Sequence, residues 1–328
     1  MRTLSIGGAI LMALSAQHAA AQPPAPNPDQ PNRLILLGTK GGPVVDVERS
    51  EPATLLVVRG SPYLIDVGTG TAHQLLKAGF PTTSINTIFI THHHLDHTAG
   101  LSPLLSLNWI NQGLSGAKPS SLNVYGPPST EYLVKAALNV LSVSERIFRA
   151  GIPSLPAGET RFFGHDVEPG IVFQNGDLKV TAVENTHFSH ASIGPSGVKD
   201  RSYSYRFDAG KTSIVFTGDT GPSSAVNALA KGADILVSEV LLPRPAAEAK
   251  RPLTAIGKEL TAHMTLEHLT VAEVAKMAAS AGVGQVVLTH FAGVLTPQVE
   301  AATLEEMRQY YKGKVVFGKD LMSINLDQ

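Results

Sequence analysis

The chain has 328 residues, no cysteine and a formal net charge of −1, and 43% of its residues are hydrophobic. With only 16% charged residues, this composition excludes an intrinsically disordered chain and is enough for one large core or two. The lack of cysteine excludes disulfides and thiolate metal ligands. The chain has no basic excess that would favour a polyanion-binding surface, so a nucleic-acid partner is not expected.

The first 21 residues have the pattern of a secretory signal peptide. Arg2 precedes an apolar run, and the segment ends in small residues at 19–21. The apolar run is too short to cross a bilayer comfortably, so we expect no membrane span once residues 1–21 are removed. An amphipathic N-terminal helix is the alternative. The proline-rich stretch 22–32 predicts a disordered linker, and the mature protein is expected in the periplasm or outside the cell.

Regular structure is predicted to begin after this linker, in one domain that spans 33–328. Apolar runs bounded by turn residues predict strands, and Gly60-Ser61 joins two of them as a hairpin. The first half is predicted to contain strands at 33–39, 53–60, 62–68, 85–91 and 122–127 and helices at 72–79, 100–113 and 129–151.

In the second half, predicted strands come to alternate with predicted helices, which favours a layered α/β fold. Histidines and aspartates fall just after several strand ends, where the sites of such folds usually lie. The predicted strands are 177–188, 202–210, 211–221, 233–240, 285–290 and 314–318, and the predicted helices are 223–232, 269–282 and 303–311.

The stretch THHHLDHTAG follows a predicted buried strand and is rich in metal-ligating side chains. His92 and His94 are two residues apart, so on a continued strand they face the same side, whereas His93 points away. Asp96 and His97 follow at the turn into the next segment. Imidazole suits zinc, and a carboxylate adds a hard oxygen ligand. Four ligands exceed the needs of one three-ligand catalytic metal, so the pattern predicts two metal ions.

The H-x-H-x-D-H pattern of these residues resembles the signature of the metallo-β-lactamase superfamily. The resemblance covers nearly the whole mature chain, because later motifs match in the same order. It implies an α/β fold of the αββα sandwich type, in which two sheets lie between helical layers and the site lies at one edge. It also implies a hydrolase with a binuclear metal centre.

Three later motifs complete the ligand set that this resemblance implies. The motif VTAVENTHFSH offers His187 and His190, and the spacing of His187 from the V-T-A strand is similar to that in the tRNA 3′-processing endonuclease and arylsulfatase-like branches. His190 remains the alternative ligand. Asp219 in FTGDTG resembles the aspartate that bridges two metals, or else belongs to a plain turn. His290 in VVLTHF follows another strand.

The resemblance therefore divides the ligands between two metals. Two-metal hydrolases hold their ions about 3.5–4 Å apart. Zinc is the first expectation, and iron and manganese are alternatives for a nitrogen and oxygen donor set. His92, His94 and His187 would hold one metal, Asp96, His97 and His290 would hold the other, and Asp219 would bridge them together with a water or hydroxide.

The leaving group of an ester needs a proton, and His268 is the candidate donor. It lies in an H-x-T motif that resembles the one in the tRNA-processing endonuclease and arylsulfatase-like branch. In that branch a glutamate orients the histidine, and Glu239 matches this glutamate, so the dyad would act as a general acid. Asp96 would steer the nucleophile as well as bind metal. His263 is the alternative acid, and a helix cap is the alternative role for His268.

Three other residues have two interpretations each. Asp66 matches a carboxylate that orients ligating imidazoles, but an aspartate in a turn would look the same in sequence. Trp109 and Tyr203 could contact substrate, although core packing or strand pairing is favoured for both.

The leader and the motifs together favour an exported hydrolase of sulfate or phosphate esters, with an arylsulfatase slightly ahead of a phosphodiesterase. The stretch HHHLDHTAGL is also similar to the signature of class II cyclic-nucleotide phosphodiesterases. The expected partner is a small anionic ester. The alternative enzyme is a lactonase or carboxylic-ester hydrolase of the same fold, and the alternative outside catalysis is a metal-binding scaffold.

Two other activities of the superfamily are disfavoured by the sequence. Hydrolysis of β-lactams is disfavoured because the chain lacks cysteine and contains Asp219. A tRNA endonuclease is disfavoured because it would act in the cytoplasm and need a basic surface or an RNA-binding arm. Folds of this kind often form homodimers, but no sequence pattern here names an interface.

Overall fold

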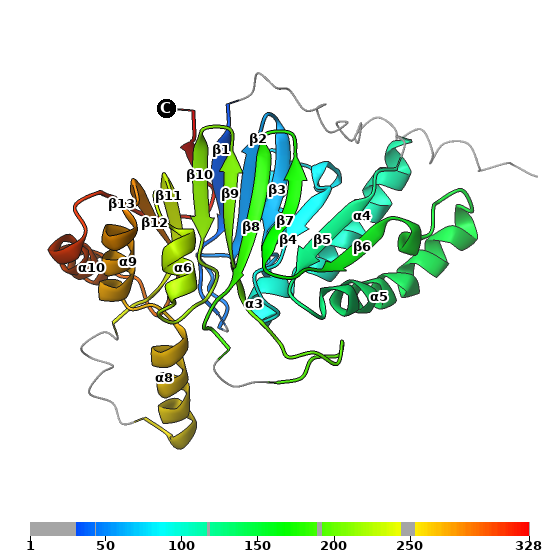
Figure 1. The fold of residues 1–328 in the computed structure, drawn as a ribbon. Helices are drawn as coiled ribbons and strands as arrows, with labels where there is room; N and C mark the ends of the chain where they lie inside the picture. The colour runs from blue at the N-terminus through cyan, green and yellow to red at the C-terminus, as the bar shows by residue number, and fades with distance from the viewer. Residues whose placement is uncertain (1–30, 43, 117–118, 189–191, 244–252, 328) are drawn as a thin grey trace, which may run out of the picture.

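Two seven-stranded sheets face each other at the centre of the protein, as the computed structural model shows (Figure 1). The structure describes residues 31–42, 44–116, 119–188, 192–243 and 253–327. The strand order is β14-β1-β2-β3-β4-β5-β6 in one sheet and β13-β12-β11-β10-β9-β8-β7 in the other. Apart from β14, each sheet is therefore built from one half of the chain.

The first sheet begins with antiparallel pairs and continues with parallel ones. The predicted hairpin between β2 and β3 turns at Arg59 and Gly60, whose φ angles of 48° and 75° suit a tight two-residue turn. The strands are β1 (Arg33–Gly38), β2 (Ala53–Val58), β3 (Ser61–Ile65), β4 (Thr87–Phe89), β5 (Leu122–Gly126), β6 (Phe162–Asp166) and β14 (Met322–Asn325).

The second sheet pairs its strands antiparallel from β7 to β10 and parallel from β10 to β13. The carboxyl ends of neighbouring parallel strands lie at the same edge of a sheet. The candidate site lies at this edge of the sandwich, near the parallel strands of both sheets. The strands are β7 (Gly170–Asn175), β8 (Leu178–Glu184), β9 (Tyr203–Ala209), β10 (Thr212–Phe216), β11 (Ile235–Leu241), β12 (Gln285–Ala292) and β13 (Lys314–Phe317).

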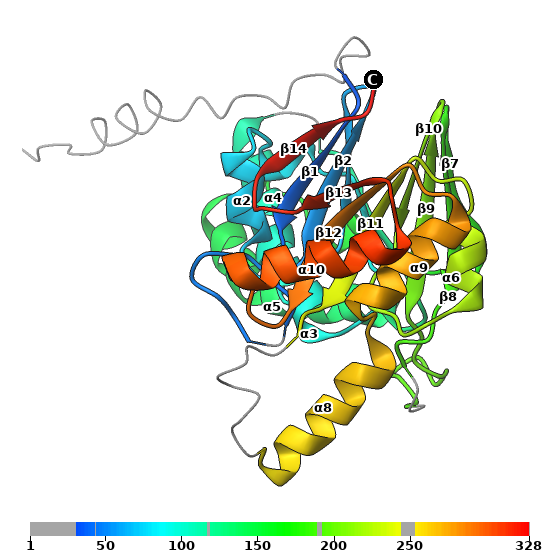
Figure 2. The same cartoon turned by 90° about the vertical axis from the view of Figure 1, so that its left-hand side faces the viewer.

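Helices cover the outer face of each sheet (Figures 1 and 2). Apolar side chains of α2 (Thr71–Lys77), α4 (Leu101–Ser115) and α5 (Thr130–Gly151) pack against the first sheet. Those of α6 (Ser224–Leu229), α9 (Val271–Ala281) and α10 (Pro297–Tyr310) pack against the second. A third apolar cluster fills the space between the sheets. The predicted αββα sandwich is confirmed.

Four further helices, three of them short, complete the described fold. The 3₁₀ helices η1 (Thr82–Ser84) and η2 (Gly158–Thr160) flank the first sheet, and α3 (Leu95–Thr98) follows β4. Helix α8 (Ala255–Glu267) extends away from the body in both views (Figures 1 and 2). No helix within the described ranges is long and apolar enough to cross a membrane.

Several predictions concern the start of the chain or large aromatic side chains. The predicted signal peptide, 1–21, and most of the linker, 22–32, lie outside the described residues.

Trp109 is 1% exposed and its indole donates to the Pro156 carbonyl at 2.8 Å. Tyr203 is fully buried and donates to the Val167 carbonyl at 2.9 Å. Both residues therefore belong to the core.

Candidate metal centre

The structure gathers the predicted ligands from both halves of the chain at one edge of the sandwich. The H-x-H-x-D-H residues follow β4 and enter α3, while His187 follows β8 and Asp219 follows β10. His290 lies inside β12 rather than after it, with φ at 42°, and the pairing register of β12 with β11 shifts between Leu288 and Phe291, a stretch that includes His290. Such an irregularity re-aims a side chain, which brings His290 to the same edge.

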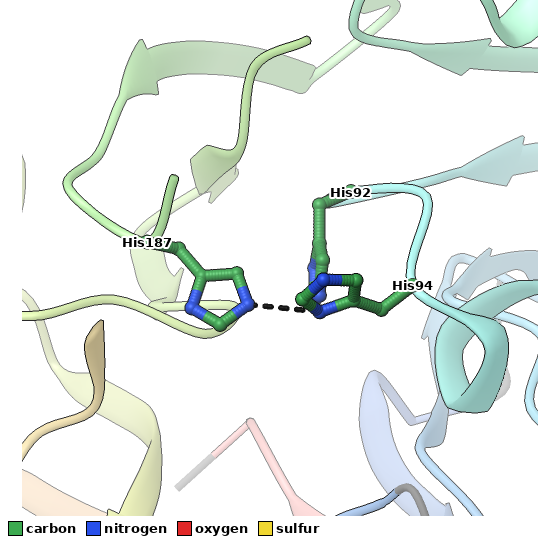
Figure 3. Close-up of side chains that lie close together, drawn as sticks. All are labelled: His92, His94 and His187. Carbon is green, nitrogen blue, oxygen red and sulfur yellow. Dashed lines mark hydrogen bonds between the residues drawn. The ribbon is translucent and has the colours of Figure 1, made fainter. Parts of the chain in front are cut away.

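Three histidines form the first cluster (Figure 3). His92, His94 and His187 each offer one ring nitrogen, and these nitrogens lie within 4.8 Å of one another. His187 Nε2 and His94 Nδ1 are 3.0 Å apart. Two ligands of a tetrahedral zinc ion at about 2.1 Å would lie roughly 3.4 Å apart. The cluster therefore has the spacing of a zinc site.

The other ring nitrogens of His187 and His92 are held by the protein. His187 Nδ1 donates to the Glu267 carbonyl at 2.9 Å, and Thr91 Oγ1 lies 3.1 Å from His92 Nδ1. Because a carbonyl only accepts, the Nε2 of neutral His187 carries the lone pair. Burial lowers the pKa of His187 to about 4 and lowers that of His92 well below its usual value. Both imidazoles are thus neutral at pH 7, the form that binds metal.

Four side chains form the second cluster: Asp96, His97, Asp219 and His290. His97 Nε2 lies 3.5 Å from Asp96 Oδ2 and 3.4 Å from Asp219 Oδ2. His290 Nε2 lies 3.3 Å and 3.1 Å from the same two oxygens. Two carboxylates and two imidazoles thus converge on one point, with all four residues buried.

The second cluster favours positive charge, unlike the first. Burial alone would lower the pKa of His290, but the Asp219 and Asp96 carboxylates outweigh it and raise this pKa to about 10. The same carboxylates, with Asp66, raise the pKa of His97 well above its usual value against the effect of burial. In this structure the positive charge comes from the protons on His97 and His290. A bound divalent cation would supply that charge instead.

Asp219 lies between the two clusters. Its Oδ2 is 3.8 Å from His92 Nε2 and 3.9 Å from His187 Nε2, besides its contacts in the second cluster. Its Oδ1 and the Nε2 atoms of His92 and His97 are buried and lack a hydrogen-bond partner among the described residues. Buried polar atoms are rarely left so, and divalent metals would satisfy all three. The residues present fit two metal ions, and the position of Asp219 suits the bridge.

Asp66 holds His97 in place. Its Oδ2 accepts from His97 Nδ1 at 2.8 Å and from Thr91 Oγ1 at 2.9 Å, and its Oδ1 accepts from the Thr91 amide at 2.8 Å. Asp66 adopts a φ of 58°, which is rare outside glycine. The geometry favours the orienting role over a plain turn.

A pair of glycines after β1 packs against the second cluster, and the sequence reasoning missed it. The amide of Gly42 donates to Asp96 Oδ2 at 2.8 Å. A Cβ on Gly42 would lie 2.3 Å from Asp96 Cγ, and one on Gly41 would lie 2.8 Å from His290 Nδ1. Only glycine lets the backbone approach these ligands so closely. The Gly-Gly dipeptide was the one signal in the sequence.

His268 and Glu239 are hydrogen-bonded to each other beside Asp219. Glu239 Oε2 pairs with His268 Nδ1, and its Oε1 accepts from the Thr220 amide at 2.7 Å. Both oxygens of Glu239 are thus engaged by protein groups. The alternative role of His268, a cap at the start of the next helix, is not seen. His268 follows α8 directly, and Thr270 caps α9 with a capping box.

The two alternative histidines and His93 occupy other places. His263 lies on α8, 39% exposed, with its Nδ1 3.0 Å from Glu267 Oε2, so it is not paired with Glu239. His190 lies outside the described residues. His93 Nε2 lies 3.0 Å from Thr130 Oγ1, away from both clusters, as strand alternation predicted.

A cavity of about 490 Å³ opens beside the first cluster. His94 lines it, together with side chains of α5, α8 and the segment between β8 and β9. The sequence reasoning gave no sign of this cavity, because its walls come from three separate parts of the chain.

The family of the chain follows from a comparison with known proteins. A family model described as "Beta-lactamase superfamily domain" matches residues 62–291, which hold every candidate ligand. The chain belongs to the metallo-β-lactamase superfamily. It is a metal-dependent hydrolase of that superfamily, with a site for two divalent metal ions, as predicted.

Relatives within the superfamily are named Ribonuclease Z. The protein of that name from Mycobacterium avium (strain 104) is 29% identical over 297 residues, covering 90% of this chain and 98% of the relative. The one from Mycobacterium bovis (strain BCG / Pasteur 1173P2) is 27% identical over 296 residues, covering 89% of this chain and 98% of the relative. Their names agree with the endonuclease side of the predicted branch, which the resemblance had shared between tRNA 3′-processing endonucleases and arylsulfatase-like proteins.

Solved structures share the fold at low identity. The short form of human tRNase Z has a TM-score of 0.62 and 22% identity, covering 90% of this chain and 100% of that one. The metallo-β-lactamase fold protein YhfI from Bacillus subtilis has a TM-score of 0.66 and 18% identity, covering 90% of this chain and 99% of that one.

These relatives correct two predictions. The predicted hydrolysis of small sulfate or phosphate esters, with an arylsulfatase ahead of a phosphodiesterase, is wrong, because the relatives are named as ribonucleases. The expectation of a small anionic ester and no nucleic acid is wrong for the same reason. The net charge of the whole chain does not describe the charge around one site, where bound metals would supply the positive charge.

Proposed function

We propose that the protein is a metal-dependent phosphodiester hydrolase that cleaves RNA. The observation that carries the proposal is the His268–Glu239 pair, which lies beside two ligand clusters that meet at Asp219. A phosphodiester needs neutralisation of its charge and a proton for its leaving oxygen, and this arrangement offers both. The relatives named Ribonuclease Z support RNA as the substrate.

In the proposed reaction, water attacks phosphorus and the P–O bond to the leaving ribose oxygen breaks. His268 Nδ1 is engaged by Glu239, so Nε2 is the ring atom that gives its proton to the leaving oxygen. Burial would lower the pKa of His268, but the Glu239 carboxylate outweighs burial and raises it. When bound, two divalent metals supply Lewis acidity and lower the pKa of the attacking water.

Zinc is the metal we propose. The seven ligands comprise five imidazoles and two carboxylates, a nitrogen-rich set that suits zinc better than magnesium or calcium. Iron and manganese remain alternatives for such a set.

The test is cleavage of a 3′-extended tRNA precursor by the full-length protein after reconstitution with zinc. We expect metal-dependent cleavage that falls strongly in His268→Ala. His73→Ala is the matched control, because His73 lies on α2, outside both clusters and the cavity. Absence of RNA cleavage by the zinc-loaded protein, or turnover of p-nitrophenyl acetate alone, would contradict the proposal.

The location of the protein is a separate proposal. We propose that residues 1–21 direct export and are then removed, on the strength of the early Arg2, the apolar run and the small-residue end. Cell fractionation followed by N-terminal sequencing tests this. A mature protein that starts near Gln22 outside the cytoplasm is expected, and a cytoplasmic protein that keeps its N-terminus would contradict it.

A further inference from the structure

We propose that the cavity beside the first cluster is a subsite for one nucleobase of the substrate. Tyr132 and Phe188 would supply the stacking surface, and His263, fixed by Glu267, would supply a polar contact. The inference rests on the proposed RNA-cleaving function and specifies which part of the RNA this site reads.

The position of the cavity connects it to the metal centre. The ring of Phe188 lies 5.1 Å from that of His94 and 5.2 Å from that of His187, measured between centroids, and Phe188 and His94 both line the cavity. A group held in the cavity is therefore next to a group bound at the first cluster. For a phosphodiester at the metals, the adjoining group is a nucleoside.

The chemistry of the walls suits a base better than a phosphate. None of the described residues that line the cavity is a lysine or arginine. Asp200 and Glu267 line it instead, and their carboxylates would repel a phosphate, whereas the Asp200 carboxylate could accept a hydrogen bond from an N–H group of a base. Single-stranded RNA is commonly bound with its bases splayed out and stacked on aromatic side chains.

Tyr132 is the side chain best placed for stacking. It is 55% exposed and lies on the first turn of α5, at the cavity wall. An exposed aromatic ring at the edge of a cavity beside the candidate metal centre offers a large apolar face to a ligand held there. The volume of about 490 Å³ lies in the usual range for small-molecule sites and is large enough for a nucleoside.

The His263–Glu267 pair connects the cavity to the catalytic groups. Glu267 is 1% exposed, its carboxylate lies 3.0 Å from His263 Nδ1, and its backbone carbonyl accepts from the metal-ligating His187. The pair fixes the ring of His263 and leaves its Nε2 for a ligand. His268, the proposed general acid, directly follows Glu267 in the chain. A base held at His263 would therefore have a defined position relative to the acid.

The experiment measures binding by the zinc-loaded, full-length protein with isothermal titration calorimetry. Each of the four nucleoside 5′-monophosphates is compared with ribose 5-phosphate, which has the same phosphate and sugar but no base. Stacking of one base on an aromatic side chain is worth roughly 5- to 100-fold in affinity. We expect at least one nucleotide to bind tighter than ribose 5-phosphate by such a factor.

Variants assign this difference to the cavity. Tyr132→Ala should bring the ratio of the two dissociation constants close to one, Tyr132→Phe should restore it, and His263→Ala should lower it. Tyr310→Ala is the matched control, because Tyr310 is 42% exposed and lies on α10. Equal binding of all nucleotides and ribose 5-phosphate by the wild type would overturn the inference, as would a ratio that survives in Tyr132→Ala.

The binding ratio does not depend on turnover, so the two proposals can fail separately. If the zinc-loaded protein fails to cleave RNA but keeps a base-dependent ratio lost in Tyr132→Ala, the proposed function falls and the subsite stands. If RNA is cleaved and the ratio is one, the subsite falls and the function stands.

Discussion

His97 donates its Nδ1 proton to Asp66 Oδ2 over 2.8 Å, so that in the neutral ring Nε2 carries the lone pair and faces the second cluster. Replacing the carboxylate in Asp66→Asn removes this fixed acceptor. Partners that orient a metal-ligating histidine are worth about 10- to 100-fold in metal affinity. We therefore expect zinc affinity to fall by about that factor, measured by competition with a chelating dye. Asp208→Asn, on the partly exposed part of β9, should leave it unchanged.

The general-acid role of His268 predicts a dependence on the leaving group. A ribose alkoxide needs a proton in the transition state, whereas p-nitrophenolate leaves without one. We expect His268→Ala to slow cleavage of RNA by about 10²- to 10⁴-fold and of bis-p-nitrophenyl phosphate far less. Glu239→Gln should show the same selectivity with a smaller loss. Equal losses on both substrates would assign His268 a purely structural role.

The carboxylates of the second cluster predict that metal binding displaces protons. In the metal-free protein the pKa of His290 is raised to about 10, so its ring is protonated at neutral pH. A metal must displace that proton, so apparent zinc affinity should increase as pH rises from 6 to 8. Calorimetry in buffers of different ionisation enthalpy should show net proton release. Removal of the metals with a chelator should abolish hydrolysis, and zinc should restore it.

The close approach of Gly42 predicts a site-selective defect. The Cβ of Gly42→Ala would lie 2.3 Å from Asp96 Cγ, so Asp96 must move and lose the hydrogen bond from the Gly42 amide. We expect the affinity for one of the two metals to fall by about tenfold or more. Gly151→Ala is the matched control, because a Cβ there meets nothing within 4 Å. Two unchanged metal affinities in Gly42→Ala would contradict the role of this contact.

Replacement of the buried Trp109 is expected to lower stability without weakening substrate binding. Trp109 is 1% exposed, packs in the apolar cluster between the first sheet and its helices, and its indole donates to the Pro156 carbonyl. Trp109→Ala should lower the free energy of unfolding by about 3–5 kcal/mol, measured with urea. KM should not change at temperatures where the variant is folded. Leu107→Ala, 41% exposed on the same helix, should be close to neutral.

The sequence predicted most strands, most helices and the sandwich, because apolar periodicity and turn residues report burial directly. It missed β6, β7 and β14, whose side chains are mostly exposed or half-buried and so give no apolar run. It also missed α8, where Ile256, Leu260 and Leu266 are exposed. Without a buried stripe, that helix has no periodic signal.

The candidate site was predicted at the level of ligands but not of their supports. Histidines and aspartates with fixed spacing are visible in a sequence, whereas the Gly42–Asp96 and His187–Glu267 contacts join residues 54 and 80 positions apart. Such contacts exist only in three dimensions. The substrate prediction failed for another reason, since it relied on the leader and on net charge, and neither describes the site itself.

The two halves of the chain each contribute part of the ligand set. His92, His94, Asp96 and His97 follow the first sheet, whereas His187, Asp219 and His290 come from the second. Neither half alone can form either cluster, so metal affinity is gained only when the sheets dock. By thermodynamic linkage, metals that bind only the docked state stabilise it by RT ln(1 + [metal]/Kd), about 4 kcal/mol at a thousandfold excess over Kd. The concentration of metal in the surroundings would therefore help to set the fraction of the chain that is folded.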